Sequence, residues 1–147
     1  PFHPGRDRSR TPMQWTGDAG AGFTTGKPWL PINPDYKERN VEAQMKNPDS
    51  LLSWYRSLIE LRKKEPALQT GSIEFLKSCI DDEVLAYRRV AGDAQVLVVL
   101  NVSARSRENP FRQGGTVLCS SHRKPESPIG GDTRLAPWEA TIYKPIQ

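Results

Sequence analysis

Hydrophobic positions change their spacing near residue 66. Before that point, apolar side chains recur at three- and four-residue intervals: Leu51, Leu52, Trp54, Tyr55, Leu58, Ile59 and Leu61. This spacing predicts a helix over residues 48–65, in which Asn47 caps the start. Pro66 ends it, because a residue before proline avoids the α region. The apolar stripe is wider than a lone surface helix needs, so we expect the helix to be buried on a broad face.

Beyond residue 71 the apolar positions form short runs typical of β-strands. These runs cover residues 72–77, 84–90, 95–101, 116–119 and 140–143. The run 95–101 is apolar on both faces and predicts a central strand. Residues 91–94 contain Gly92 and predict a hairpin turn. Short strands separated by turns predict a small antiparallel β-sandwich.

The first 46 residues show no regular period. Six of the thirteen prolines fall within residues 1–34, among the aromatic side chains of Trp15, Phe23, Trp29 and Tyr36. A structureless segment of this length indicates a functional loop or a loop whose scaffold lies elsewhere in the protein. The chain also begins at Pro1 without methionine, so we expect it to be part of a longer protein.

Four motifs occur in a characteristic order. They are RTPMQW at 10–15, AGFTTGKPWLP at 21–31, Asn40-Val41-Glu42, and Ala136-Pro137-Trp138-Glu139-Ala140. Together they resemble the α-glucosidases and oligo-1,6-glucosidases of the α-amylase superfamily, over nearly the whole chain. In this resemblance Thr16 and Gly20 depart from the usual Asp and Asn, which puts the local hydrogen bonding of the loop in doubt.

The resemblance implies a mainly β chain, in which a C-terminal antiparallel β-sandwich follows the end of a truncated (β/α)8 barrel. Residues 1–70 would be the barrel remnant, comprising the loop after strand 8 and the last helix. Residues 71–147 would be the β-sandwich domain. Barrel enzymes build their active sites from loops at the C-terminal ends of the strands. The proline-rich loop would therefore lie close to the substrate.

The resemblance also implies a retaining mechanism, in which two carboxyl groups stand about 5 Å apart across the scissile bond. In this family those groups, and a third that holds the sugar, sit on earlier barrel strands, upstream of Pro1. We find no substitute for them in the chain, because its early acidic residues all lie in loop sequence: Asp7, Asp18, Asp35, Glu38 and Glu42. We expect no catalytic residue here, and no hydrolysis by the chain alone.

One residue of this chain matches a functional residue of the family. Arg6 matches an arginine that lines the substrate pocket, where a guanidinium can donate several hydrogen bonds to hydroxyls or a carboxylate. Alternatively, Arg6 only ties the loop through a salt bridge. Arg10 fits a structural donor better. Trp15 and Trp29 are loop anchors or sugar-stacking platforms, and Trp138 belongs to the core or to a domain interface.

Composition adds few constraints. The net charge of +4 comes from 21 Lys and Arg against 17 Asp and Glu, scattered along the chain. Nucleic-acid binding needs such charge on one face, so we expect none. No apolar run is long enough for a transmembrane helix. Cys79 and Cys119 have no metal or disulfide spacing, and His3 and His122 are isolated. We expect no metal or cofactor, buried thiols and a cytoplasmic location.

Three functions remain open. The first is the C-terminal portion of an α-glucosidase that acts on short α-1,6- or α-1,4-glucosides through its missing N-terminal barrel. The second is a noncatalytic β module, or an ectodomain piece similar to the amino-acid transporter heavy chains. The third is a piece of a sucrose isomerase or trehalose synthase, which would share the fold and differ in loops absent from this chain.

Overall fold

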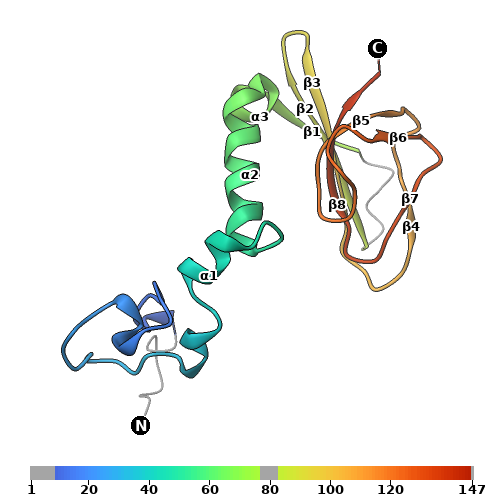
Figure 1. The fold of residues 1–147 in the computed structure, drawn as a ribbon. Helices are drawn as coiled ribbons and strands as arrows, with labels where there is room; N and C mark the ends of the chain where they lie inside the picture. The colour runs from blue at the N-terminus through green and yellow to red at the C-terminus, as the bar shows by residue number, and fades with distance from the viewer. Residues whose placement is uncertain (1–8, 77–82, 147) are drawn as a thin grey trace. The chain divides into compact units, whose positions relative to one another are not determined.

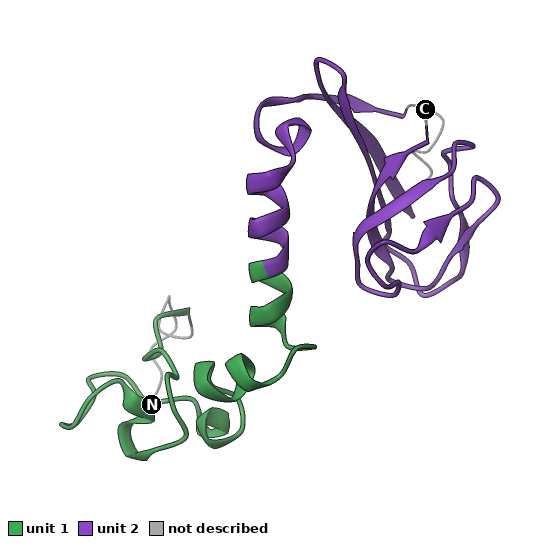
Figure 2. Ribbon diagram, turned by 45° about the horizontal axis from the view of Figure 1, so that its top comes forward, with its two compact units in different colours: residues 1–56 green, residues 57–147 purple. Residues whose placement is uncertain are grey.

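The computed structural model describes residues 9–76 and 83–146. It divides into two compact units, residues 1–56 and residues 57–147 (Figure 2). Each unit is described by itself. The predicted domains, residues 1–70 and 71–147, stay a prediction.

The first unit is mostly irregular, as the sequence predicts. Its described residues include the short 3-10 helices η2 (Ala19–Gly22) and η3 (Pro34–Lys37) and the six-residue helix α1 (Val41–Lys46). The side chain of Asn40 caps α1 by accepting a hydrogen bond from the backbone N–H of Ala43 at 2.8 Å. A cap of this kind lets a very short helix form within a loop.

The longest helix, α2 (Leu51–Lys64), begins three residues later than predicted. Asn47 ends α1 instead of capping α2, and its side chain accepts from the backbone N–H of Asp49. Ser50 takes the capping role, because its hydroxyl accepts from the backbone N–H of Ser53 at 3.2 Å.

The predicted burial of α2 is wrong for this chain, since none of its residues is buried. Leu51, Tyr55 and Ile59 are spaced four apart on one stripe, with 66%, 59% and 51% of their surfaces exposed. Periodicity correctly identifies the apolar face. It does not show whether anything covers that face.

Pro66 ends α2 as predicted and opens the next helix, α3 (Pro66–Thr70). Glu65, directly before it, has the extended backbone that proline imposes, with φ −101° and ψ 108°. Proline suits the first position of a helix, because its missing N–H would find no partner there. In the second unit, α3 packs on β2 and β3, and its Ala67 is fully buried.

The second unit is built on one six-stranded antiparallel sheet with the order β1-β2-β3-β8-β5-β6 (Figure 1). Its strands are β1 (Ser72–Phe75), β2 (Val84–Ala91), β3 (Ala94–Asn101), β5 (Gly115–Ser120), β6 (Pro128–Ile129) and β8 (Ala140–Pro145). A two-stranded ribbon, β4 (Arg107–Glu108) with β7 (Arg134–Leu135), forms a separate small sheet. The mainly antiparallel β class is confirmed, and the second sheet is only this ribbon.

The central position of β3 is confirmed, because it pairs with β2 on one side and β8 on the other. Its residues 96–99 are all buried, so both faces of the strand are covered. The hairpin between β2 and β3 is also confirmed, with Ala91 opposite Ala94. Gly92 in this turn has φ +57°, a conformation that glycine adopts without steric cost.

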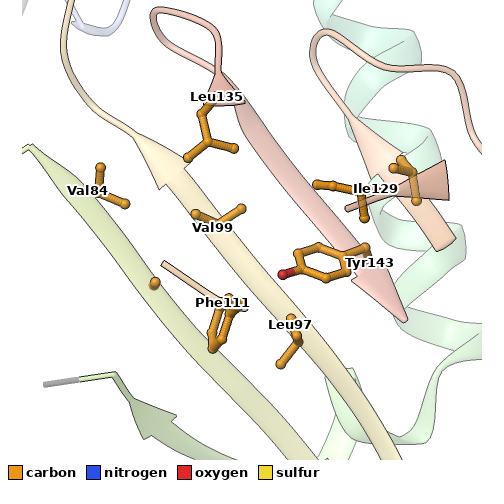
Figure 3. Packing of buried hydrophobic residues seen from close by; sticks show 9 residues of the cluster. Val84, Leu97, Val99, Phe111, Ile129, Leu135 and Tyr143 are labelled. Carbon is orange, nitrogen blue, oxygen red and sulfur yellow. The ribbon is translucent and has the colours of Figure 1, made fainter. Parts of the chain in front are cut away.

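The hydrophobic core of the second unit lies on one face of the sheet, where Phe111 and Leu135 from outside the sheet join the buried strand residues (Figure 3). Val84 and Ala86 of β2 alternate with outward-facing residues, as a half-buried strand requires. Tyr143 is fully buried at the centre, with its ring edge-on to Phe111 at 6.3 Å. The other members of the cluster are Leu97, Val99, Val117, Ile129 and Leu135.

Trp138, predicted to belong to the core or to a domain interface, is not in this core. Its side chain is 63% exposed, so the core alternative is wrong and the interface alternative stays a prediction. Cys119 is a free, buried thiol as expected, and burial raises its pKa. Cys79 lies outside the described residues. Within those residues, no helix is both long and apolar enough to cross a membrane.

Candidate functional site

The predicted substrate-binding residue, Arg6, lies outside the described residues, as do Asp7 and His3. Its role therefore stays a prediction. Arg10, the next arginine of the motif, is exposed. The contacts of the motif loop that the structure describes begin at Thr11.

The RTPMQW segment is fixed to the start of α1 by backbone hydrogen bonds. The N–H of Val41 donates to the carbonyl of Gln14 at 2.9 Å, and the N–H of Glu42 donates to that of Trp15 at 3.0 Å. The side-chain amide of Gln14 donates to Asp35 Oδ1 at 2.9 Å and to the carbonyl of Arg39 at 2.7 Å. Motif residues separated by more than twenty positions thus form one scaffold.

The two departures from the family pattern sit in a tight turn within this scaffold. The backbone N–H groups of Trp15 and Thr16 both donate to the carbonyl of Ala21, at 2.9 and 3.1 Å. Gly20 has φ +74°, a conformation that glycine adopts without steric cost. The Thr16 hydroxyl donates to Asp18 Oδ2 at 3.1 Å and accepts from the Asp18 N–H at 3.2 Å. Threonine therefore keeps the turn hydrogen-bonded.

Large apolar side chains of this loop face solvent in the chain. Trp29 is 80% exposed, and Met13, Trp15 and Phe23 are each about half exposed. A hollow of ≈ 280 Å³ lies beside the motif, lined by residues that include Thr11, Gln14, Asp35, Arg39 and Gln44. Exposed aromatic rings above a fixed backbone suit either sugar stacking or contact with a protein surface.

Three acidic side chains of the first unit make local contacts. Asp18 binds the Thr16 hydroxyl, Asp35 binds the Gln14 amide, and Glu42 pairs with Lys46 at 2.7 Å. No group of three or more His, Cys, Asp or Glu side chains that could hold a metal occurs within residues 9–76 and 83–146.

The second unit contains a buried polar network that sequence reasoning missed. Glu139 is 1% exposed and accepts hydrogen bonds from Arg123 Nε at 2.5 Å, the backbone N–H of Ala136 at 2.7 Å and the Thr141 hydroxyl at 2.8 Å. Burial alone would raise the pKa of Glu139, but these hydrogen bonds and the Arg123 charge together lower it. The network fixes the turn before β8 and has no free carboxylate oxygen for catalysis.

Comparison with known proteins identifies both segments. Residues 3–71 match the family described as alpha amylase, catalytic domain, and residues 78–142 match a domain of unknown function, DUF3459. The chain belongs to the α-amylase family. It corresponds to a C-terminal portion of the members related to oligo-1,6-glucosidase. The resemblance carried by its four motifs is confirmed.

The similar curated proteins are glucosidases about four times as long. An oligo-1,6-glucosidase of Parageobacillus thermoglucosidasius is 36% identical over 97% of this chain, which spans 26% of that relative. A glucan 1,6-α-glucosidase of Streptococcus pneumoniae is 43% identical over 92% of this chain and 25% of its own length.

Similar solved structures carry a different activity in their names. An isomaltulose synthase from Klebsiella sp. LX3 has a TM-score of 0.85 and 37% identity, covering 96% of this chain and 26% of that one. A trehalulose synthase from Pseudomonas mesoacidophila MX-45 has a TM-score of 0.82 and 39% identity, with the same coverage. Hydrolases and isomerases of the α-amylase family therefore both resemble this chain.

Proposed function

We propose that this chain is the C-terminal portion of a retaining α-glucosidase that hydrolyses short α-1,6- or α-1,4-glucosides. The observation that carries the proposal is the folded motif loop, in which the Gln14 side chain joins Asp35 and the Arg39 carbonyl. The same segment falls within the match to the α-amylase catalytic domain, and the curated relatives cited above are glucosidases. A loop held this rigidly can orient a substrate with little entropic cost.

In this proposal the chain supplies a wall of the substrate site, and the catalytic carboxylates come from the upstream part of the protein. Retaining hydrolysis requires a nucleophile and a general acid about 5 Å apart. The carboxylates of Asp18, Asp35 and Glu42 are each engaged with a different local partner. The chain alone is therefore inactive in this proposal.

We assign Arg6 to the substrate pocket. Arg6 lies eight positions before Gln14 in the sequence, and the resemblance to the family matches it to an arginine that lines the substrate pocket. The planar fork of an arginine can donate two parallel hydrogen bonds, and a lysine cannot reproduce this geometry. A role in binding sugar hydroxyls therefore predicts that Arg6→Lys impairs the enzyme.

The test measures glucose release by the full-length protein that contains this chain. We expect hydrolysis of isomaltose, maltose or both, and no activity of the 147-residue chain. Arg6→Lys should lower kcat/KM by at least tenfold, whereas the matched control Arg10→Lys should change it less than threefold. A full-length protein that releases no glucose from either disaccharide would refute the proposal.

Sucrose isomerisation is the second candidate, favoured by the isomaltulose and trehalulose synthases among the similar structures. Both activities start by breaking a glucosidic bond, and they differ in whether water or the released sugar attacks next. Incubation of the full-length protein with sucrose separates them. An isomerase yields mainly an isomeric disaccharide, and a hydrolase yields glucose and fructose.

A further inference from the structure

Asn101, Val102 and Ser103 form the sequence pattern of an N-glycosylation acceptor. This pattern is Asn-X-Ser or Asn-X-Thr, with X other than proline, and it occurs once among the 147 residues. The glycan is bulky and is attached to the asparagine side chain, so an acceptor that carries one in a folded protein lies on the surface. The middle residue meets this expectation, because Val102 follows β3 and is 50% exposed.

The acceptor residue itself is buried and fully hydrogen-bonded. Asn101 is 2% exposed. Its Nδ2 donates to the carbonyl of Arg105 at 2.6 Å and to that of Ala136 at 2.7 Å, which uses both of its hydrogens. Its Oδ1 accepts from the hydroxyl of Ser103 at 2.8 Å and from the Ser103 N–H at 3.1 Å. A glycan on Nδ2 would replace a bonded hydrogen and needs space that this side chain does not have.

A distant segment completes this burial. Ala136 lies 35 positions after Asn101 in the sequence. The Asn101 N–H also donates to the carbonyl of Glu139 at 2.8 Å, and the carboxylate of Glu139 accepts from the Ala136 N–H at 2.7 Å. These bonds hold residues 136–139 against the acceptor. In an unfolded chain they are absent, and only the neighbouring residues of the pattern remain close to Asn101.

We propose that Asn101 is an N-glycosylation site of the unfolded chain, and that a glycan there and the folded second unit exclude each other. The co-reactant is a glycan joined to a lipid diphosphate. Transfer breaks the bond from sugar C1 to the diphosphate oxygen and forms a bond from C1 to Nδ2, which releases one proton. The lipid diphosphate is the leaving group. One Nδ2 hydrogen then remains for two buried carbonyls, so one of them loses its donor.

The first test secretes the full-length protein that contains this chain from a eukaryotic host, where the chain meets the transfer reaction before it folds. Peptide mass spectrometry measures the glycan on Asn101 in the soluble and the insoluble fractions. We expect an occupancy at least about tenfold lower in the soluble fraction, because only chains without the glycan bury Asn101. Equal occupancy in both fractions overturns the proposal, whether or not the protein hydrolyses isomaltose.

A matched control variant separates closure of the site from the fractionation itself. Pro125→Asn places the same acceptor pattern, with Glu126 and Ser127, in an exposed turn of the second unit. Folding leaves this turn exposed, so the glycan on residue 125 should occur in the soluble fraction as often as in the insoluble one. Its loss from the soluble fraction would mean that any glycan prevents recovery, and would overturn the specific role of Asn101.

A truncated form tests whether residues 136–139 close the site. A stop codon in place of Ala136 removes both distant bonds to Asn101. Occupancy of Asn101 in the truncated chain should then exceed that in the full-length protein. A truncated chain without a glycan on Asn101 would show that the pattern is no acceptor, and the proposal would fail.

The last measurement is the yield of folded protein. Ser103→Ala removes the acceptor pattern and leaves both Nδ2 hydrogen bonds of Asn101 in place. This variant should raise the secreted soluble yield, and should give no increase in a bacterial cytoplasm without the transfer reaction. An increase of equal size in both hosts would assign the gain to stability and would contradict the proposal.

Discussion

The two units differ in how much of their apolar side-chain surface they bury. Residues 57–147 bury a continuous cluster of nine side chains between a sheet and its covering segments. Of the hydrophobic side chains described in residues 1–56, only Ala21, Leu30 and Pro12 are buried, whereas Trp29 is 80% exposed. The first unit is held by backbone and side-chain hydrogen bonds. The difference shows that one unit carries its own core, while the other presents apolar surface to be covered.

The largest expected effect comes from cutting the core of the second unit. Leu97 is fully buried on β3 and contributes to the main cluster. Leu97→Ala should lower the free energy of unfolding by about 2–5 kcal/mol, through lost burial and a residual cavity. Urea unfolding followed by circular dichroism measures this. A loss below about 1 kcal/mol would contradict a self-sufficient core.

The buried ion pair gives the next largest effect and a pH signature. Glu139→Gln removes the charge from three donors and should cost about 1.5–3 kcal/mol. Because folding lowers the pKa of Glu139, its contribution is present above the unfolded value of about 4.3 and is lost as the pH falls through the folded pKa. Urea midpoints between pH 7 and pH 3 should therefore converge for wild type and Glu139→Gln.

A smaller effect tests the hydrogen-bonded first unit. Asn40→Ala removes the cap of α1 and the donation from Asn40 Nδ2 to the Tyr36 carbonyl at 2.8 Å. Loss of a cap costs about 0.5–2 kcal/mol. Amide exchange should accelerate in residues 41–46 and stay unchanged in β3, with Asp49→Ala as a nearby control. Faster exchange in β3 would mean that the two units are energetically coupled.

The smallest expected effect concerns the exposed stripe of α2. Tyr55→Ser removes a side chain that is 59% exposed and should change the free energy of unfolding of the chain by less than about 0.5 kcal/mol. The same substitution in the full-length protein should cost more than 1 kcal/mol if the upstream part covers this stripe. Equal effects in both would show that the stripe stays in solvent.

Elements with long patterns could be predicted from the sequence. The spacing of α2, the apolar run of β3 and the Gly92 turn each depend on local chemistry that the sequence displays. The strands β4, β6 and β7 have two residues each and show no period. The sequence predicts Asn47 as the cap of α2, but Asn47 ends α1 and Ser50 caps α2 instead. The prediction failed because two helices lie next to each other in this short segment.

Burial and polar networks depend on distant residues, so sequence patterns cannot reveal them. The sequence predicts that Trp138 belongs to the core or to a domain interface, and the structure exposes it in the turn before β8, which excludes the core. Glu139 shows no spacing signal for its ion pair, since its charged partner Arg123 lies 16 residues away in the sequence. For the candidate site, the family motifs predicted the irregular loop and the resemblance to α-glucosidases. The role of Arg6 stays a prediction.

The strand order has a consequence for synthesis. β8 is made after β3 and β5, yet it lies between them in the sheet. Until the ribosome has released residues 140–145, β3 and β5 are separate edges with unpaired backbone groups, which can pair with other nascent chains. A premature stop just before residue 140 should therefore remove a central strand of the sheet and cause aggregation.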